Sequence, residues 1–360
     1  MAKNKRKITG ESPIAADLFC GSGSVSAALA SAGFRVAFAI DNDDSAKATY
    51  TKNHPSTLFF GQDIGDVDPL DAKGSLQGRP LSILAVCAPC QPFSSQNRKR
   101  NKADQRAPLV LEALRFAKAL KPETIWVENV PGIVRSEAKQ ELREGLSKLG
   151  YSFSDPIRVS ATDLGVPQRR FRSIFVASKS DFVLKRFESL RTTPSVITPP
   201  TVRMAFSGLK PVGLGEQCPI DPLHRARRHS PITIQRLRAI PKDGGSRAAL
   251  PENLQLACHR NLQAKSFPDV YGRMAWDLPS PTLTTGCTDV TRGRFAHPEQ
   301  DRAITLREAA RLQTFPDSYS FEGTHTQIAR LIGNAVPYEM ARQIFLRLFS
   351  EEVPAQICGA

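Results

Sequence analysis

The chain has 360 residues, of which 41% are hydrophobic and 23% are charged, a composition typical of a globular protein with room for a large domain and a smaller one. No apolar run approaches the roughly 18 residues of a membrane span, and no apolar stretch follows the basic N-terminus, so we expect neither a membrane protein nor a secreted one. The 49 Lys and Arg residues outnumber the 35 Asp and Glu residues, and the net charge of +14 favours a polyanionic partner such as nucleic acid. The seven scattered cysteines indicate reduced thiols and a cytoplasmic protein.

The first half of the chain alternates short apolar strands with helical segments. A strand, a turn at Gly21 and Gly23 and a helix are expected in succession over residues 13–34. Further strands are expected over 35–43, 81–86, 124–127 and 173–177, and helices over 109–120 and 138–150. Because these strands are apolar throughout, we expect an α/β fold with a doubly wound parallel sheet.

The composition changes near residue 191. From there to about 290 the chain is rich in Pro and Gly and contains a cationic cluster over 224–229, whereas helical patterns return over 305–316 and 338–349. We therefore expect a smaller, loop-rich domain inserted into the α/β domain. The expected divisions are a disordered basic arm over 1–12, the α/β domain over 13–193, the inserted domain over 194–292, the return to the first domain over 293–352, and a tail over 353–360.

The turn after the first strand indicates a nucleoside site. Residues 19–23, FCGSG, end a strand and open a helix, which is where open α/β sheets bind ligands. Asp41, after the second strand, is placed to accept hydrogen bonds from ribose hydroxyls, and Asp63 from an adenine amino group. A lone GxG is a weak signal, since Ser26 stands where the dinucleotide fingerprint needs glycine, and either acid alone fits a helix cap or a solvated turn. Together they favour a nucleoside-containing cofactor without specifying which one.

A thiol, a carboxyl group and arginines are expected to converge on the same edge of the sheet. Cys90 follows one strand and Glu128 follows the next, with one helix between them. Sequential parallel strands are usually neighbours, so both side chains should project from adjacent strand ends. The run Gln168-Arg169-Arg170-Phe171-Arg172 directly precedes another strand. This edge of the sheet is therefore the expected reaction site.

Cys87 stands three residues before Cys90 and leaves three interpretations open. The pair could be a redox couple or half of a zinc site, or Cys87 could be a small buried side chain. Zinc would need two more ligands, and the next cysteine downstream is Cys218. We favour the buried side chain and expect no metal site.

These motifs, taken in order, resemble those of the DNA cytosine-5 methyltransferases of prokaryotes, whether from restriction–modification systems or as orphan enzymes. The resemblance covers nearly the whole chain and rests on DLFCGSG, AIDND, QDI, APCQPFS, WVENV, VPQRRFR, SPTLTTG and IGNAVP, with a variable region before the last two. It implies a Rossmann-like fold that uses S-adenosyl-L-methionine and a target recognition domain over 194–292. It also implies methyl transfer to C5 of cytosine in a specific duplex DNA sequence.

The resemblance gives each residue of the expected reaction site a role. Cys90, as thiolate, would add to C6 of the base and make C5 nucleophilic. Glu128 would hydrogen-bond N3 and the 4-amino group, Arg170 would hold the O2 side, and Arg172 would position the catalytic loop or a phosphate. Because C6 is hidden in a stacked duplex, the base must be flipped out, and the basic loop over 91–106 would close over it.

The remaining site residues also follow from the resemblance. The expected cofactor contacts are Phe19, Gly21, Gly23, Asp41, Asn42, Asp63, Leu109 and Asn334. The expected DNA contacts are Gln91, Ser94, Arg98, Arg100, Arg227, Arg228, Thr284 and Thr285. The chain departs from the family where Asp41 replaces the usual Glu, where Asn42 replaces a common aromatic residue, and where Phe171 replaces a Glu between the two motif arginines.

Three other interpretations remain open from the sequence. A non-catalytic nucleic-acid-binding regulator on this fold would be expected to lack one of the reaction-site residues, and none is lacking. A relative that methylates RNA is disfavoured by the long irregular region, and a nicotinamide dehydrogenase is suggested only by the glycine turn. We expect a monomer whose partner is double-stranded DNA. The sequence specifies neither the recognised site nor whether a cognate restriction endonuclease accompanies the protein.

Overall fold

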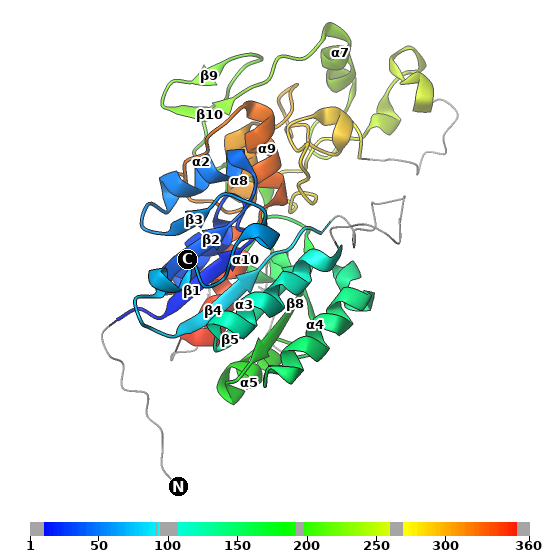
Figure 1. Ribbon diagram of the computed structural model, residues 1–360. Coiled ribbons are helices and arrows are strands. Elements are labelled where there is room, and N and C mark those ends of the chain that lie inside the picture. Colours follow the sequence, from blue (N-terminus) through cyan, green and yellow to red (C-terminus); the bar gives the residue numbers. More distant parts are fainter. Residues whose placement is uncertain (1–10, 91–92, 94–106, 192–197, 260–268, 351–360) are drawn as a thin grey trace.

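The computed structural model describes residues 11–90, 93, 107–191, 198–259 and 269–350. Its strands are β1 Ile14–Leu18, β2 Arg35–Ile40, β3 Leu58–Phe60, β4 Leu81–Val86, β5 Thr124–Asn129, β6 Ser152–Phe153, β7 Ile157–Ser160, β8 Phe171–Ser178, β9 Gln217–Cys218 and β10 Asp221–Arg225. Its helices are α1 Ser24–Ser31, α2 Asp44–Asn53, α3 Glu112–Leu120, α4 Glu137–Lys148, α5 Asp181–Ser189, α6 Val202–Phe206, α7 Pro231–Ala239, α8 Leu306–Leu312, α9 His325–Asn334 and α10 Tyr338–Phe349. They form a sheet lobe and a second, loop-rich lobe, which carries α7, β9 and β10 (Figure 1).

The sheet lobe confirms the predicted α/β architecture. Strands pair in the order β3-β2-β1-β4-β5-β8-β6, with β7 also paired to β8. The five strands from β3 to β5 are parallel, as expected, whereas β8 is antiparallel to β5. The antiparallel end follows from the connections, since β6, β7 and β8 succeed one another with no long crossover helix between them. From β1 the sheet grows first in one direction, through β2 and β3, and then in the other, through β4 and β5. Such switch points in the strand order are where α/β sheets bind ligands.

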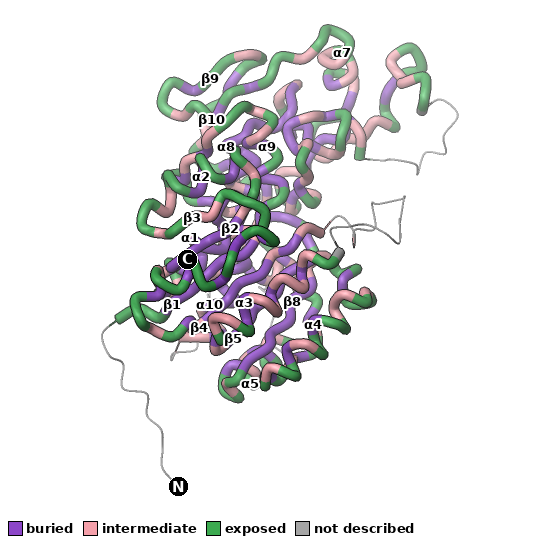
Figure 2. The backbone as a smooth tube through the Cα atoms, in the orientation of Figure 1, coloured by how far each residue is buried: buried purple, intermediate pink, exposed green. Residues whose placement is uncertain are grey.

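Helices cover both faces of the sheet. One face packs Ala15 and Trp126 against α1, α5 and α10, and the other packs Leu18 and Val127 against α3 and α4. Figure 2 shows the strands as a buried layer between half-exposed helices. Burial on both faces explains why the strands are apolar throughout.

The second lobe has its own core, which extends beyond the predicted boundary at residue 292. Val202 and Phe206 of α6 and Leu283 pack with Ala309 of α8 and Ile332 of α9. Of the segment expected to return to the first domain, Val336 and α10 lie in the core of the sheet. The segment over 293–335 therefore joins the two lobes rather than belonging to the sheet alone.

No helix in the described part of the chain is long and apolar enough to cross a membrane. The described residues also contain no cluster of His, Cys, Asp and Glu that could hold a metal ion.

Candidate active site

The glycine turn, Phe19–Gly23, joins β1 to α1 at the switch point of the sheet. Its backbone has positive φ at Phe19 (61°), Gly21 (52°) and Gly23 (86°). Glycine adopts such angles without strain, which explains two of these three residues. The turn brings the Gly21 amide to β2, where it donates a hydrogen bond of 2.8 Å to Oδ2 of Asp41.

Asp41 and Asp63 lie at the ends of neighbouring strands, as predicted. Oδ1 of Asp41 accepts from the amide of Asp43 at 3.0 Å, and Asn42 donates to Oδ2 of Asp63 at 3.3 Å. Asp63 also caps a short 3-10 helix by accepting from the Gly65 amide at 2.9 Å, so the cap that the sequence left open is present. Burial raises the pKa of Asp41, and its two backbone donors oppose that rise. A carboxylate has about four acceptor positions, so Asp41 retains some for a ligand.

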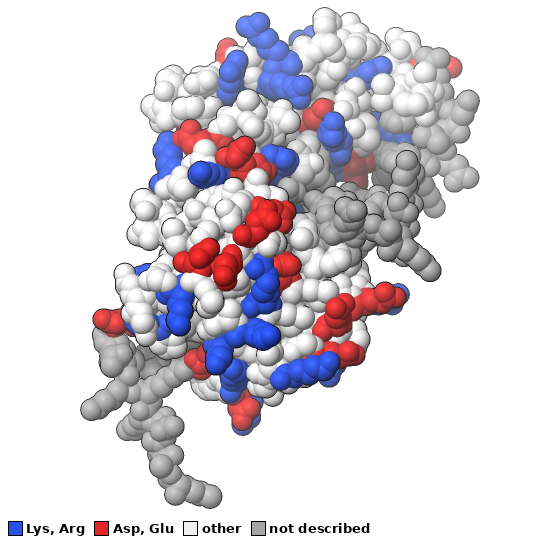
Figure 3. Space-filling view, in the orientation of Figure 1, with Lys and Arg blue, Asp and Glu red and all other residues white. Residues whose placement is uncertain are grey.

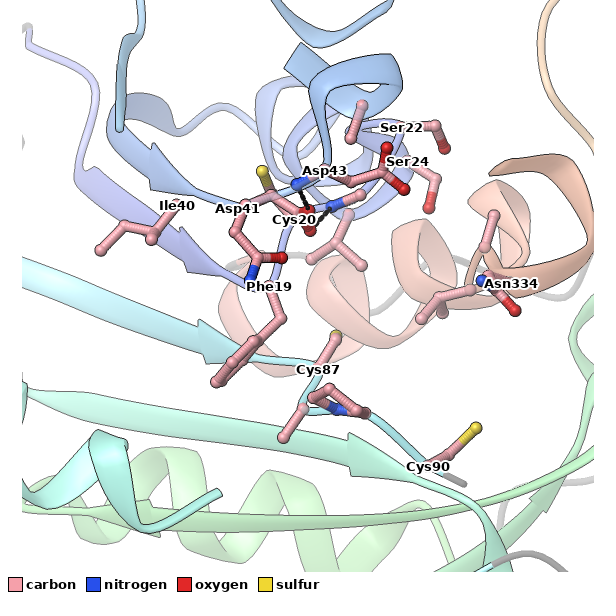
Figure 4. Close-up of a pocket in the computed structure, with 18 of the residues that line it drawn as sticks. Phe19, Cys20, Ser22, Ser24, Ile40, Asp41, Asp43, Cys87, Cys90 and Asn334 are labelled. Carbon is pink, nitrogen blue, oxygen red and sulfur yellow. Dashed lines mark hydrogen bonds between the residues drawn. The ribbon is translucent and has the colours of Figure 1, made fainter. Parts of the chain in front are cut away.

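A cavity of about 460 Å³ extends from the glycine turn to the ends of β4 and β5. Ten of the predicted catalytic and cofactor residues line it: Phe19, Gly21, Asp41, Asn42, Asp63, Cys90, Leu109, Glu128, Arg172 and Asn334. Two do not, namely Gly23 and Arg170. Figure 4 shows Phe19, Asp41 and Cys87 at the ends of strands and Asn334 projecting from α9.

Cys90 reaches this cavity from the loop after β4. Val86 of β4 is paired with Val127 of β5, so the predicted adjacency of the two strands is confirmed. Asn129, a residue that the sequence analysis did not select, is buried and donates to the Ala88 carbonyl at 2.9 Å. This hydrogen bond ties the segment carrying Cys90 to the end of β5. In the sequence, Asn129 is marked only by its place in the WVENV motif, directly after Glu128.

The second thiol of this segment differs from Cys90 in its surroundings. Cys87 packs against the core on the α1 and α10 side of the sheet. Burial, followed by the charges of Glu128 and Asp17, raises the pKa of Cys87 well above the usual value, so its thiol stays protonated. A protonated thiol is a poor nucleophile. Cys87 is half-buried and also lines the cavity, so it is not the fully buried side chain that was predicted.

Glu128 is paired with Arg172 within the cavity. The Nε atom of Arg172 lies 2.8 Å from Oε1 of Glu128, and the side chains are 11% and 7% exposed. The two side chains therefore form a buried ion pair. Burial raises the pKa of Glu128, and Arg172 and Arg170 oppose the rise.

Arg170 lies behind the cavity rather than in its wall. Its guanidinium is buried, and Nη1 donates to the carbonyls of Leu283 at 3.2 Å and Gly333 at 3.4 Å. Nearby, Gln168 accepts from the Leu283 amide and donates to Oε1 of Gln313. The sequence analysis named Gln168 in the run before the strand β8 but gave it no role, and the structure shows that it joins this segment to the second lobe.

The predicted DNA contacts are only partly within the described residues. Gln91, Ser94, Arg98 and Arg100 lie outside them. Arg227 and Arg228 are exposed between β10 and α7, where Lys and Arg gather at the end of the second lobe (Figure 3). Arg227 lies 3.9 Å from Asp289, so its charge is partly balanced.

The Thr284–Thr285 backbone packs closely on Gly333 of α9. A Cβ at Gly333 would lie 2.2 Å from the Thr284 carbonyl oxygen and 2.8 Å from the Thr285 amide. These two threonines therefore pack on the last turn of α9, next to Asn334, which lines the cavity.

A profile of the C-5 cytosine-specific DNA methylases matches residues 15–350. The chain belongs to this family. It is 38% identical over 339 residues to the Type II methylase M.HgiDII of Herpetosiphon aurantiacus, covering 91% of this chain and 92% of that protein. It is 31% identical over 357 residues to the Type II methyltransferase M1.BsuMI of Bacillus subtilis, covering 93% and 80%.

The fold is also similar to that of a solved prophage-encoded protein of Escherichia coli described as a DNA modification methyltransferase. The TM-score is 0.71 at 26% identity, and the match covers 94% of this chain and 98% of that one. As a C-5 cytosine-specific DNA methylase, the chain is a DNA cytosine-5 methyltransferase, which confirms the predicted family, fold and enzyme class. The alternatives of a nicotinamide dehydrogenase and of a non-catalytic regulator are thereby set aside.

Proposed function

We propose that this methylase transfers a methyl group from S-adenosyl-L-methionine to C5 of a cytosine flipped out of duplex DNA, through a covalent bond between Cys90 and C6. The observation that carries the proposal is the single cavity that joins the glycine turn and Asp41 to Cys90 and Glu128. One continuous space suits a reaction in which a nucleoside-bearing donor and a base must meet.

The residues of the cavity fit the proposed cofactor. A volume of about 460 Å³ is within the usual range for small-molecule sites. Asp41 has acceptor positions for ribose hydroxyls, and Asp63 is placed for the adenine amino group. Phe19, Ile64 and Leu109 offer apolar surface to the adenine ring. S-adenosyl-L-methionine bound there would supply an electrophilic methyl group.

The protein's own groups would prepare the base for that methyl group. The Cys90 thiolate forms a bond to C6, and the electron pair of the 5,6 double bond becomes available at C5. Glu128 hydrogen-bonds N3 and the 4-amino group and stabilises the charge that develops on the ring. After transfer, loss of the C5 proton restores the double bond and expels the thiolate.

Arg172 would hold Glu128 until the base arrives. Its ion pair occupies one carboxylate oxygen of Glu128. The predicted role of Arg170 at the O2 side of the base would require it to reach past its present carbonyl partners. Arg172 is therefore the arginine whose position in the cavity agrees best with direct contact to the base or the catalytic loop.

The proposal also covers how the protein would recognise DNA and in what setting it would act. Residues 194–292 would read the DNA sequence through contacts that include Arg227 and Arg228, and Thr284 and Thr285 would support that region at the cavity. The protein would act as a monomer in the cytoplasm. A cognate restriction endonuclease, acting independently, would cut the same site when it is unmethylated.

The test is methyl transfer by the Cys90→Ala variant. Pure protein is incubated with unmethylated bacteriophage DNA and tritiated S-adenosyl-L-methionine, and label in DNA is counted. Transfer should fall by about a thousandfold or more because the step that activates C5 is lost. The control Cys358→Ala removes a thiol from the tail over 353–360, to which the proposal gives no role, and should leave transfer unchanged. Substantial transfer by Cys90→Ala would refute the nucleophile assignment.

A further inference from the structure

Two side chains hold the glycine turn from the side away from the cavity. The hydroxyl of Tyr319 donates to the Ser22 carbonyl at 2.5 Å, and Nε2 of His54 lies 3.1 Å from the Gly23 carbonyl. The same Nε2 lies 3.2 Å from the Tyr319 hydroxyl. His54 ends α2, whereas Tyr319 follows α8, so residues far apart in the chain meet at one turn.

The hydrogen positions in this group follow from its partners. A carbonyl can only accept, and the Tyr319 hydroxyl already gives its proton to Ser22, so Nε2 of His54 carries a hydrogen. Burial lowers the pKa of His54 to about 4, so the ring is neutral near pH 7. Both carbonyls are therefore held by neutral donors over the physiological pH range.

Gly23 makes room for this contact because it has no side chain. A Cβ at Gly23 would lie 2.7 Å from Nε2 of His54 and 2.9 Å from the Tyr319 hydroxyl. Gly23 does not line the cavity, although it was predicted as a cofactor contact. The absence of a side chain at this position lets His54 and Tyr319 reach the backbone of the turn.

Further polar contacts anchor the two side chains. Asn53 and Ser320 exchange hydrogen bonds of 2.8 and 3.0 Å, and Thr49 accepts from the Glu322 amide at 2.9 Å. These contacts dock the segment after α8 onto α2. The placement of Tyr319 is thus defined by the backbone on both sides and does not depend on the hydroxyl alone.

We infer that His54 and Tyr319 are positioning residues that hold the glycine turn in the conformation that binds the cofactor. The inference rests on the proposed function, in which Gly21 and Asp41 receive S-adenosyl-L-methionine. The two residues fix the Ser22 and Gly23 carbonyls, and the turn between those carbonyls and β1 presents Gly21 to Asp41. Without them, part of the population leaves this conformation, and the apparent dissociation constant rises by the inverse of the competent fraction.

The test compares Tyr319→Phe with Tyr151→Phe. Tyr151 also donates from a buried hydroxyl to a carbonyl, that of Pro122, but it lies outside the cavity and the turn. Binding of S-adenosyl-L-methionine is measured by calorimetry, and kcat and KM for the cofactor are measured with unmethylated DNA. Tyr319→Phe should raise Kd and KM about fivefold, the effect of one net hydrogen bond, with kcat at saturating cofactor retained. Tyr151→Phe should bind as wild type does.

His54 gives a second test through rescue. His54→Leu should raise the cofactor Kd as Tyr319→Phe does, and His54→Gln, which restores an N–H donor, should recover most of the affinity. Wild-type binding by Tyr319→Phe, or an equal loss in Tyr151→Phe, would overturn the inference. If the wild-type protein did not bind S-adenosyl-L-methionine, the proposed function itself would be overturned. If wild type binds S-adenosyl-L-methionine and Tyr319→Phe binds it equally well, the inference alone fails and the proposed function stands.

Discussion

Replacing Arg172 with glutamine is expected to destabilise the protein by about 3 kcal/mol at pH 8 and by much less at pH 5. Arg172 and Glu128 are 11% and 7% exposed and 2.8 Å apart, so the substitution leaves a buried carboxyl without its partner. Removal of one partner of a buried ion pair costs about 3 to 5 kcal/mol. We expect the lower end because Arg170 also lowers the pKa of Glu128 and remains in the variant.

The pH dependence follows from the raised pKa of Glu128. Burial raises it above the ordinary value of 4.5, and Arg172 opposes the rise. A carboxyl whose pKa is raised in the folded state contributes its full stability below the ordinary pKa and loses it as pH rises through the folded pKa. Without Arg172 the folded pKa rises further, so the variant's deficit grows with pH above about 4.5.

The free energy of unfolding is measured by urea denaturation at pH 5 and pH 8. The control is Arg203→Gln, which breaks an ion pair with Asp277 between side chains that are 57% and 71% exposed, and it should have little effect on stability at either pH because solvent screens the pair. The double variant Glu128→Gln/Arg172→Gln should recover much of the loss because no charge remains unpaired. A loss below about 1 kcal/mol in Arg172→Gln, equal at both pH values, would refute this reasoning.

Two further predictions concern the packing of α9 and the cofactor site. Gly333→Ala should destabilise the protein by about 1 to 3 kcal/mol in the same assay because the new Cβ would overlap the Thr284 carbonyl. The control Gly74→Ala should have little effect because no atom lies within 4 Å of its new Cβ, and equal stabilities of the two variants would contradict the close packing. Asp41→Ala should weaken binding of S-adenosyl-L-methionine in calorimetry more than it lowers kcat at saturating cofactor, since ribose contacts serve ground and transition states alike, and an unchanged affinity would remove Asp41 from the site.

The sheet and the convergence of Cys90 with Glu128 could be predicted because both depend on local rules. Apolar strands separated by one helix form neighbouring parallel strands, and the pairing of β4 with β5 follows directly. The antiparallel β8 could not be predicted in the same way, because β6 and β7 are too short to give a clear pattern. Helix α2 was missed because its sequence, DSAKATYTKN, is mostly polar and buries only four residues.

Contacts between segments that lie far apart in the chain could not be predicted from the sequence pattern. The pairing of Arg172 with Glu128 depends on the register of β8 against β5, which aligns Ser173 with Asn129. The meeting of Tyr319 with Ser22 joins residues 297 positions apart, and no periodicity specifies it. The core that α8 and α9 share with α6 likewise depends on tertiary packing, so a change in composition could mark the start of the second lobe but not its end.

Covalent catalysis by Cys90 is tested most directly with DNA in which 5-fluorocytosine replaces the target base. Fluorine at C5 cannot leave as a cation, so once Cys90 has added to C6 and the methyl group has transferred, the thiolate cannot be expelled. With S-adenosyl-L-methionine and a duplex carrying a demonstrated target site, a denaturing gel should show a protein–DNA band for wild type and none for Cys90→Ala. The absence of that band for wild-type protein would contradict a covalent intermediate at Cys90.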